Sequence, residues 1–464
     1  MGSVKRRSLL QQAFFSALSV GVAPLGVGLL NASSGARAAG NICMLVSGRD
    51  QLQLPTGRLA NIGPLQIVDS LGIALPKGFA ARKLAEAKKP VATPAGKSAY
   101  SRYKWHTFPD GGAVLPRPNG GWVYTSNSEI PLLPLGGCGA LAFNAEGLVE
   151  DAYSILKRTT QNCAGGATPW HTWISCEESK DGLCWECNPF EEGQGVAKPA
   201  LGRFAHEAVA VDSLRRTVYL TEDINDGRFY RWTAAPGDVD ENGRMAFEQG
   251  LLEVMNIVGF HDDCYPLSDA FVRRQLGVSW VPVIEPEGQQ DKVRASLREQ
   301  KSTVPGTVFA GGEGLWAYRV PPETARALHS SSAPADVDTL IFWTTKIDNR
   351  VWVLDVANQR VELIFDNSQI DTPFKSVDNL TVSPWGDVLV AEDPPERDVS
   401  RLIVVLPNRG AQSLMEIHHP GSEICGPAFS PDGSRLYFSS QRYDRGGATY
   451  EVQLPVQIWS GAPG

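Results

Sequence analysis

Short apolar segments alternate with turn-forming residues along most of the chain. From about Tyr103 onwards, brief runs of strand-forming residues are separated by stretches rich in Gly, Pro, Asn and Asp. In several places two such runs follow each other closely, and the second run ends on acids, as in 217–223 and 387–393. This pattern predicts an all-β architecture built from short antiparallel strands.

A loose repeat underlies the pattern. Each copy consists of an acid, a short apolar strand, a turn, a second apolar strand and a polar or acidic end. The copies cover residues 206–223, 313–345, 378–393 and 423–441. Repeated units of this kind are typical of a β-propeller, and counting them predicts five or six blades, with six favoured.

Other parts of the chain do not follow the repeat. Residues 39–102 are interpreted as an N-terminal arm, in which 80–89 is predicted to form one helix. The propeller is predicted over 103–464, with a less regular and partly helical insertion at about 238–305. The 46 Gly and 32 Pro residues agree with this arrangement, because many short strands need many turns.

The acids of the repeat are predicted to converge. In a propeller blade the first strand lines the central channel and the second runs back beside it, so acids before the first and after the second share one mouth. The first position is held by Glu207, Glu313, Asp378 and Glu423, and the second by Glu178, Asp223, Glu392 and Asp393. Burying unpaired carboxylates costs several kcal/mol each, so the ring indicates bound cations or basic partners.

The stretch Cys176-Glu177-Glu178 adds a thiol to these carboxylates. Several hard oxygen donors suit calcium, whereas a thiolate at the same site indicates a transition metal. Two simpler interpretations remain open: the acids are turn caps or solvated loop residues, and Cys176 is a small buried residue. The pair Cys184 and Cys187 is interpreted as a disulfide or as half of a zinc site.

The N-terminus has the features of an export signal. Residues 1–38 contain Lys5-Arg6-Arg7, an apolar run and the small-x-small sequence Ala36-Arg37-Ala38. The pair Arg6-Arg7 predicts a twin-arginine signal peptide, with a general secretory signal or an uncleaved anchor as alternatives. We therefore expect a periplasmic or secreted protein that passes through the twin-arginine export machinery, with no stable membrane span.

The net charge of the chain limits which classes of partner are expected. The whole chain carries a formal charge of −8, and removal of the four basic residues in 1–38 makes the remainder more acidic. An acidic chain is a poor partner for nucleic acid, so we expect none. Divalent cations suit such a surface better than anions do.

Several motifs together resemble the PhoX-type alkaline phosphatases. They are Gly165-Gly166, Trp170-His171-Thr172-Trp173 followed by Cys176-Glu177-Glu178, Gly202-Arg203-Phe204-Ala205-His206-Glu207, Gly312-Glu313-Gly314, Asp378-Asn379-Leu380 and Gly421-Ser422-Glu423. Members of that family usually carry Gly where this chain has His171. The resemblance spans residues 165–441.

The resemblance implies a propeller exported by the twin-arginine route that binds calcium (Ca2+) together with iron (Fe3+). It implies a thiolate ligand to iron from Cys176. It also implies carboxylate ligands among Glu177, Glu178, Glu207, Glu313, Asp378, Glu392 and Glu423.

The predicted activity is hydrolysis of small-molecule phosphate monoesters by a monomeric enzyme. Candidate side chains for contacting phosphate are Lys346 and Arg442, each just beyond a second strand, and Arg203. Two alternatives stay open. One is a propeller hydrolase of the lactonase kind that uses a single calcium ion, and the other is a non-catalytic binding propeller of the periplasm.

Overall fold

The computed structural model describes part of the chain in detail. The described residues are 52–257, 275–291, 306–325, 328, 335–366, 374–394, 399–407 and 410–461. The predicted signal peptide, 1–38, lies outside them. Within the described residues strands dominate, and no helix has the length and hydropathy needed to cross a membrane.

The first three antiparallel units follow each other along the chain. They share one strand order, in which consecutive strands are neighbours. The first unit consists of β5 (Val114–Pro116), β6 (Trp122–Ser128), β7 (Gly136–Phe143) and β8 (Val149–Thr159). The second consists of β9 (Asn162–Ala167), β10 (Trp173–Glu177), β11 (Cys184–Cys187) and β12 (Val196–Ala197). The third consists of β13 (His206–Asp212), β14 (Thr217–Glu222), β15 (Phe229–Ala234) and β16 (Gly250–Ile257).

The next three units have the same order. The fourth consists of β18 (Gly312–Arg319), β19 (Thr339–Thr345), β20 (Arg350–Asp355) and β21 (Arg360–Asp366). The fifth consists of β22 (Val377–Val382), β23 (Val388–Glu392), β24 (Ser400–Val405) and β25 (Ala411–Ile417). The sixth contains β26 (Ile424–Phe429), β27 (Arg435–Ser440) and β28 (Ala448–Gln453). Among the described residues the strands thus form six comparable units.

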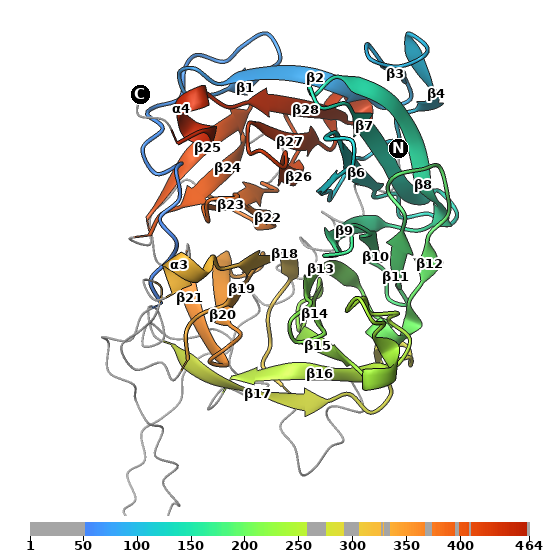
Figure 1. The fold of residues 1–464 in the computed structure, drawn as a ribbon, viewed down its shortest axis with the longest axis vertical. Helices are drawn as coiled ribbons and strands as arrows, with labels where there is room; N and C mark the ends of the chain where they lie inside the picture. The colour runs from blue at the N-terminus through green and yellow to red at the C-terminus, as the bar shows by residue number, and fades with distance from the viewer. Residues whose placement is uncertain are drawn as a thin grey trace, which may run out of the picture. The chain divides into compact units, whose positions relative to one another are not determined.

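The units are arranged around a common centre, as a propeller requires (Figure 1). Their first strands lie innermost and contact one another in sequence from β9 through β13, β18 and β22 to β26. The Tyr124 hydroxyl in β6 donates a hydrogen bond to the Gly426 carbonyl in β26 at 2.9 Å, which joins the last unit to the first. The predicted all-β propeller is therefore confirmed.

The N-terminal arm completes two outer edges. Strand β2 (Ala80–Glu86) pairs with β28 as the fourth strand of the last unit, and β1 (Ile73–Ala74) pairs with β25. The prediction of a helix over 80–89 was wrong. An isolated Ala- and Lys-rich segment favours a helix, but here the open edge of β28 offers a full ladder of backbone hydrogen bonds. A short hairpin of β3 (Pro90–Ala92) and β4 (Tyr100–Lys104) follows.

The region predicted as a partly helical insertion also contributes strands. Gly250–Ile257 is the outer strand β16, and β17 (Leu276–Pro282) pairs with both β16 and β21, which links the third and fourth units. The prediction from sequence missed these two strands. The segments 258–274 and 292–305 lie outside the described residues.

The hydrophobic core fills the spaces between neighbouring units. The packing between the third and fourth units is rich in aromatic rings, with Phe229 4.3 Å from Trp343 and Phe309 5.6 Å from Trp343 between ring centroids. The described helices are short: η1 (Pro199–Leu201), η2 (Pro236–Asp238), α3 (Pro322–Ala325), η4 (Tyr443–Arg445) and α4 (Val456–Trp459). The core therefore holds the inner strands in fixed positions around the centre.

Candidate metal centre

A repeated β-bulge turns one side chain toward the centre in the inner strands of the second to fifth units. In the third unit, His206 pairs with Glu222 and Val209 pairs with Leu220, so the inner strand has one residue more than its partner over this interval. A bulge of this kind changes the direction of side chains that would otherwise alternate. The residue at the bulge is Glu207.

The same irregularity recurs at matching places in four other units. In each, three steps along the inner strand oppose two steps along the second strand. The first bulged residue in the second to fifth units is Cys163, Glu207, Glu313 and Asp378, respectively. In the sixth unit it is Gly426, with Glu423 and Cys425 shortly before it. The bulge therefore explains how strands with a two-residue period can direct ligand-type side chains to one place.

Three of these bulges are held by a side chain of the neighbouring unit. The Asn127 side-chain amide donates to the Cys163 carbonyl at 3.1 Å, and the Thr221 hydroxyl donates to the Glu313 carbonyl at 2.6 Å. The Thr344 hydroxyl donates to the Asp378 carbonyl in the same way. All three donors lie on second strands, so at these three places the second strand of one unit fixes the bulge of the next.

A second set of side chains comes from the ends of the second strands. The residue that directly follows each second strand is, in chain order, Glu129, Glu178, Asp223, Lys346, Asp393 and Gln441. Glu178 and Gln441 are buried, and the other four are partly exposed. The bulged residues thus form a deep layer, and the residues after the second strands form a shallower rim.

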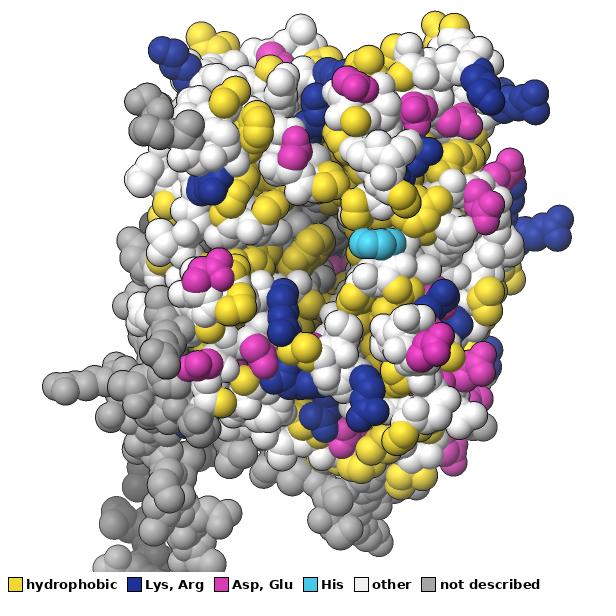
Figure 2. Space-filling view, viewed as in Figure 1, with side chains coloured by type: hydrophobic (Ala, Val, Ile, Leu, Met, Phe, Trp, Pro, Cys, Tyr) yellow, Lys and Arg dark blue, Asp and Glu magenta, His cyan; other side chains and the backbone are white. Residues whose placement is uncertain are grey.

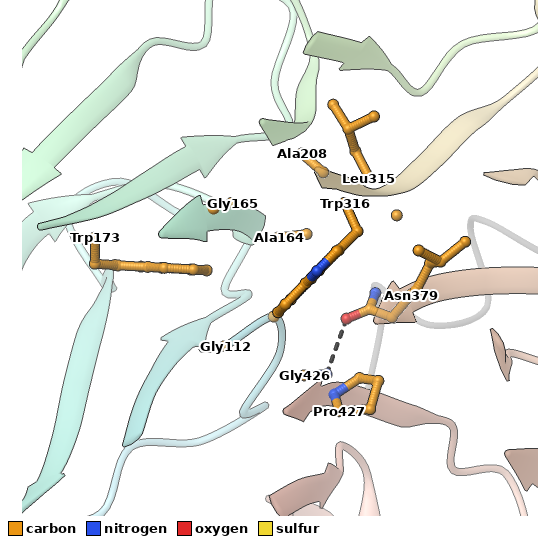
Figure 3. A pocket seen from close by; sticks show the side chains of 14 residues that line it. Gly112, Ala164, Gly165, Trp173, Ala208, Leu315, Trp316, Asn379, Gly426 and Pro427 are labelled. Carbon is orange, nitrogen blue, oxygen red and sulfur yellow. Dashed lines mark hydrogen bonds between the residues drawn. The ribbon is translucent and has the colours of Figure 1, made fainter. Parts of the chain in front are cut away.

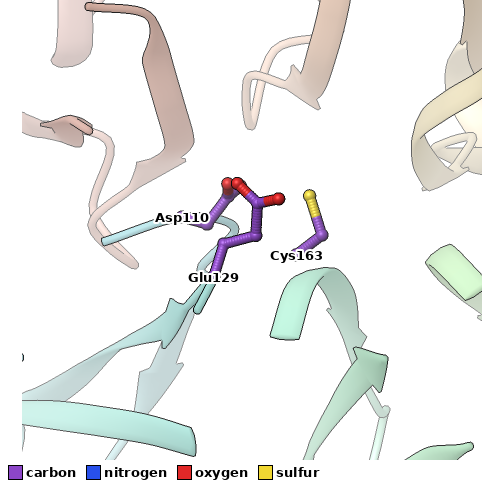
Figure 4. Close-up of side chains that lie close together, drawn as sticks. All are labelled: Asp110, Glu129 and Cys163. Carbon is purple, nitrogen blue, oxygen red and sulfur yellow. The ribbon is translucent and has the colours of Figure 1, made fainter. Parts of the chain in front are cut away.

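The two layers make a continuous cluster of possible ligand atoms, which we call the acidic ring. Within each of five groups the ligand atoms lie within 4.8 Å of one another. The groups are Asp110 with Glu129 and Cys163, Cys163 with Glu178 and Glu207, Glu207 with Glu313 and Asp378, Asp378 with Asp393 and Glu423, and Asp110 with Glu423 and Cys425. Each group shares a member with the next, and in the first the two carboxylates and the sulfur point toward one another (Figure 4).

Two basic side chains enter one side of the acidic ring. The Lys346 Nζ lies 2.6 Å from Asp378, 2.9 Å from Asp393 and 3.5 Å from Glu313. The Arg442 guanidinium lies 2.8 Å from Glu423 and 3.4 Å from Asp393. Burial acts to raise the pKa of Asp393, but Lys346 and Arg442 outweigh burial and hold that pKa below its usual range.

Glu207 lacks such compensation. It is fully buried, and neither carboxylate oxygen has a hydrogen-bond partner among the described residues. Burial, followed by repulsion from Glu178, Asp378 and Asp110, raises the pKa of Glu207 well above its ordinary value. A buried carboxylate without a partner is costly. The orphaned oxygens, with a thiol and further carboxylates around them, fit a bound cation.

Comparison with known families agrees with this geometry. The family model described as "Alkaline phosphatase PhoX" matches residues 147–194 and 181–443, together more than half of the chain. The chain belongs to the PhoX alkaline phosphatase family. It is therefore a phosphatase. No curated protein matches the chain.

A solved structure also supports the fold. Pseudomonas fluorescens PhoX, in complex with vanadate as a transition-state analogue, is similar over 89% of this chain and 100% of that chain, with 15% identity and a TM-score of 0.63. A protein of unknown function from Bacteroides thetaiotaomicron is 7% identical over 81% of this chain and 76% of that chain, with a TM-score of 0.42. A gluconolactonase from Xanthomonas campestris is 14% identical over 86% and 99%, with a TM-score of 0.36.

The acidic ring of this PhoX-family chain contains most of the residues proposed from sequence. Those it brings together are Glu178, Glu207, Glu313, Asp378 and Glu423, with Lys346 and Arg442 in contact with them. Arg203 is exposed, and its described hydrogen bond goes to the Asp181 carbonyl at 3.4 Å. Nothing in the described contacts of Arg203 connects it with the acidic ring.

Where two acids are adjacent at the end of a strand, their side chains point in different directions. Glu177 accepts hydrogen bonds from the Thr160 and Leu183 amides at 3.1 Å, so it caps a turn, whereas Glu178 reaches the acidic ring. Glu392 likewise accepts the Lys375 and Arg401 amides and pairs with the Arg401 guanidinium. Its neighbour Asp393 is the one in the ring. Successive side chains of a strand point to opposite faces, so only one acid of each pair reaches the centre.

The thiols of the acidic ring are Cys163 and Cys425, and Cys176 is not among them. Cys176 is buried in a hydrophobic cluster with Ile174, Phe204 and Val209, and belongs to none of the ligand groups found among the described residues. The motif directed attention to Cys176 because two acids follow it. Cys163 was missed because its position is filled by an acid in the neighbouring units, and a lone Cys gives no such signal.

Three further members of the acidic ring were missed. Asp110 precedes the first unit, Glu129 follows the second strand of that unit, and Cys425 lies on β26. Glu129 obeys the rule that the residue after a second strand faces the centre, so extending the repeat to Trp122–Ser128 would have found it. Asp110 accepts hydrogen bonds from the Gly111 amide and from Gln441.

Below the acidic ring, small residues allow the inner strands to approach closely. A Cβ atom on Gly314 would lie 2.3 Å from the Leu380 amide nitrogen, and one on Gly166 would lie 2.0 Å from the Val209 carbonyl oxygen. The Trp316 indole extends across the space between them, toward Gly112 (Figure 3). The opposite ends of β9, β13 and β18 line a second cavity, and the face viewed in Figure 2 is hollowed at its centre with hydrophobic side chains around the hollow.

The buried carboxyls predict an unusual pH dependence for the metal-free protein. Burial is the main cause that raises the pKa values of Glu207 and Glu313 above their ordinary 4.5. The folded state therefore binds more protons than the unfolded state, and the free energy of unfolding falls as pH rises above 4.5 toward the folded pKa values. In this range each carboxyl contributes a slope of about 1.4 kcal/mol per pH unit.

Urea unfolding in a chelator between pH 5 and pH 8 measures this slope. Asp393, whose pKa is lowered, stays ionised between pH 5 and pH 8, so its contribution to the free energy of unfolding does not change over this range. Glu207→Gln should flatten the dependence by about one carboxyl, whereas Glu416→Gln, on the outer strand β25, should leave it unchanged. Stability that stays constant or increases with pH would contradict the interpretation.

Proposed function

We propose that this chain is a metal-dependent phosphatase that hydrolyses small phosphate monoesters at the acidic ring. The observation that carries the proposal is Glu207, a buried carboxylate whose two oxygens have no hydrogen-bond partner among the described residues and whose charged neighbours are other carboxylates. A cation bound there would remove the repulsion. Family membership supports the reaction class.

We propose calcium and iron as the bound ions. Glu207, Glu178 and Asp110 offer hard oxygen atoms of the kind calcium prefers, and Cys163 offers a soft sulfur atom suited to iron. Glu313, Asp378 and Glu423 complete the oxygen donors, and Asp393 joins them at the rim. When bound, the ions would neutralise phosphoryl oxygens and lower the pKa of a coordinated water.

We propose that the Lys346–Arg442 side of the acidic ring receives the phosphate. The side chains of Lys346 and Arg442 are 28% and 31% exposed, so both are accessible from solvent while held by ring carboxylates. The Arg442 amide also donates to the Ser422 hydroxyl at 2.9 Å, which fixes the start of this side chain. A guanidinium held in this way can donate two hydrogen bonds to a phosphoryl group and orient it.

We also propose an extracytoplasmic location. The proposal rests on Arg6-Arg7 and the apolar run behind it, which predict twin-arginine export and a periplasmic or secreted protein. Export of a folded chain would allow the acidic ring to be loaded before the protein leaves the cytoplasm.

The activity itself is tested with p-nitrophenyl phosphate. Full-length protein loaded with calcium and iron should hydrolyse the ester, and incubation with a chelator should abolish the activity because the repelling carboxylates lose their cations. Adding both ions back should restore it. Circular dichroism before and after chelation serves as the control for folding. Fully metallated protein that is inactive, or activity that survives removal of the ions, would refute the proposal.

Arg442→Ala should lower kcat/KM for the ester by about 10- to 100-fold, because one charged hydrogen bond to the phosphoryl group is worth about 1.5–3 kcal/mol. Vanadate should inhibit the variant more weakly than the parent protein by a similar factor. Arg231→Ala is a matched control, since Arg231 pairs with Glu253 on outer strands. Equal losses in the two variants would argue against phosphate contact by Arg442.

Metal content separates the two candidate thiols. Cys163→Ser should lose most of its iron, as measured by elemental analysis, because it removes the sulfur that lies beside Glu178 and Glu207 in the acidic ring. Cys176→Ser should retain the iron of the parent protein, because Cys176 lies in the hydrophobic cluster. The reverse result would restore Cys176 as the iron ligand expected from the sequence motif.

A further inference from the structure

Two buried thiols face each other behind the acidic ring. Cys176 on β10 and Cys184 on β11 are direct partners in the antiparallel ladder, and their Sγ atoms are 3.8 Å apart. The next pair, Glu177 and Leu183, is joined by a backbone hydrogen bond from the Glu177 amide at 3.0 Å. Because hydrogen-bonded and non-hydrogen-bonded pairs alternate, Cys176 and Cys184 form a non-hydrogen-bonded pair, in which the strands approach most closely.

That close approach suits a disulfide. The Cα atoms of a non-hydrogen-bonded pair are about 4.5 Å apart, at the short end of the range found for disulfides. Both thiols are already within van der Waals contact, so a bond needs side-chain rotation and a small movement of the strands.

Other pairings are disfavoured by the direction of the side chains. Cys184 and Cys187 are three residues apart on one strand, so their side chains point to opposite faces. Accordingly, Cys184 belongs to the hydrophobic cluster that contains Phe204, and Cys187 to a different cluster that contains Cys138. Sequence alone left Cys184–Cys187 open as a disulfide or half of a zinc site, and the strand geometry argues against both.

We propose that Cys176 and Cys184 form a cross-strand disulfide when the protein meets a disulfide oxidant. One thiol loses a proton and attacks a sulfur of the oxidant, which releases one thiol and leaves a mixed disulfide. The second thiol loses its proton and attacks the mixed disulfide, which releases the other thiol. Two electrons pass to the oxidant, which becomes two thiols, and one S–S bond forms in the protein.

His206 can accept the proton that the Cys184 thiol loses. His206 adjoins Cys184, and its Nε2 donates to the Gly202 carbonyl at 3.1 Å. In the neutral ring this leaves Nδ1 as the acceptor, and Nδ1 is buried with no hydrogen-bond partner among the described residues.

The disulfide would lock the hairpin that carries a ring ligand. Only a turn separates Cys176 from Cys184, and Glu178 stands at the start of that turn. A bond across the last ladder pair would hold the position of Glu178 relative to Cys163. The inference does not depend on phosphatase activity, because the bond can be detected in inactive protein.

The test uses the full-length chain incubated with glutathione disulfide. The protein is then denatured in excess N-ethylmaleimide without reductant, digested and analysed by mass spectrometry. We expect a peptide pair that links Cys176 to Cys184, 2 Da lighter than the reduced pair, which disappears after reduction. Either Cys176→Ser or Cys184→Ser should abolish the link, and Cys187→Ser should keep it.

Two results would overturn the inference. One is alkylation of both Cys176 and Cys184 after prolonged oxidation, including at temperatures just below the unfolding transition, where local opening exposes buried thiols. The other is a link from either residue to a different cysteine. Elemental analysis of the same samples measures the bound metal. It therefore distinguishes the absence of the disulfide from the absence of metal at the acidic ring.

Discussion

Repulsion among carboxylates that meet at one centre is the constraint on which the rest of this structure depends. Isolated strands would avoid such a meeting, because alternation sends successive side chains to opposite faces. The chain overcomes this with a bulge repeated at Cys163, Glu207, Glu313 and Asp378, which spends one extra residue per inner strand. Side chains on neighbouring second strands hold the carbonyls of three of these residues, Cys163, Glu313 and Asp378, so neighbouring units fix these positions together.

The compensation for that repulsion is uneven. Lys346 and Arg442 supply two positive charges beside Glu313, Asp378, Asp393 and Glu423. Glu207 faces other carboxylates instead, and burial raises its pKa. The ammonium of Lys346 and the guanidinium of Arg442 thus neutralise carboxylates on one side of the acidic ring. On the side of Glu207, a cation from solution would be needed to neutralise them. Under the proposed function, the same asymmetry would let an anionic substrate bind beside Lys346 and Arg442, next to the proposed cations.

Sequence alone could predict where the acids stand in each repeat, but not which of two adjacent acids points toward the centre. The acids at Glu207, Glu313, Asp378 and Glu423 were found because each stands at the same place relative to two apolar strands. The choice between Glu392 and Asp393, or between Glu177 and Glu178, depends on where a strand ends to the nearest residue, and such boundaries are uncertain by a few residues in sequence-based prediction. The strand β2 was misjudged because its partner β28 lies more than three hundred residues away along the chain.

At the rim of the acidic ring, the type of side chain can vary independently of the backbone fold. The six residues that follow the second strands occupy equivalent places, yet they are carboxylates at Glu129, Glu178, Asp223 and Asp393, an amine at Lys346 and an amide at Gln441. The backbone geometry of each unit does not require any particular side chain there. A propeller of this kind can therefore change its ion content or substrate by substitution at the rim while the bulges and the core stay as they are. For this chain, Lys346 is the clearest instance, because an ammonium group stands where its counterparts in four other units are carboxylates.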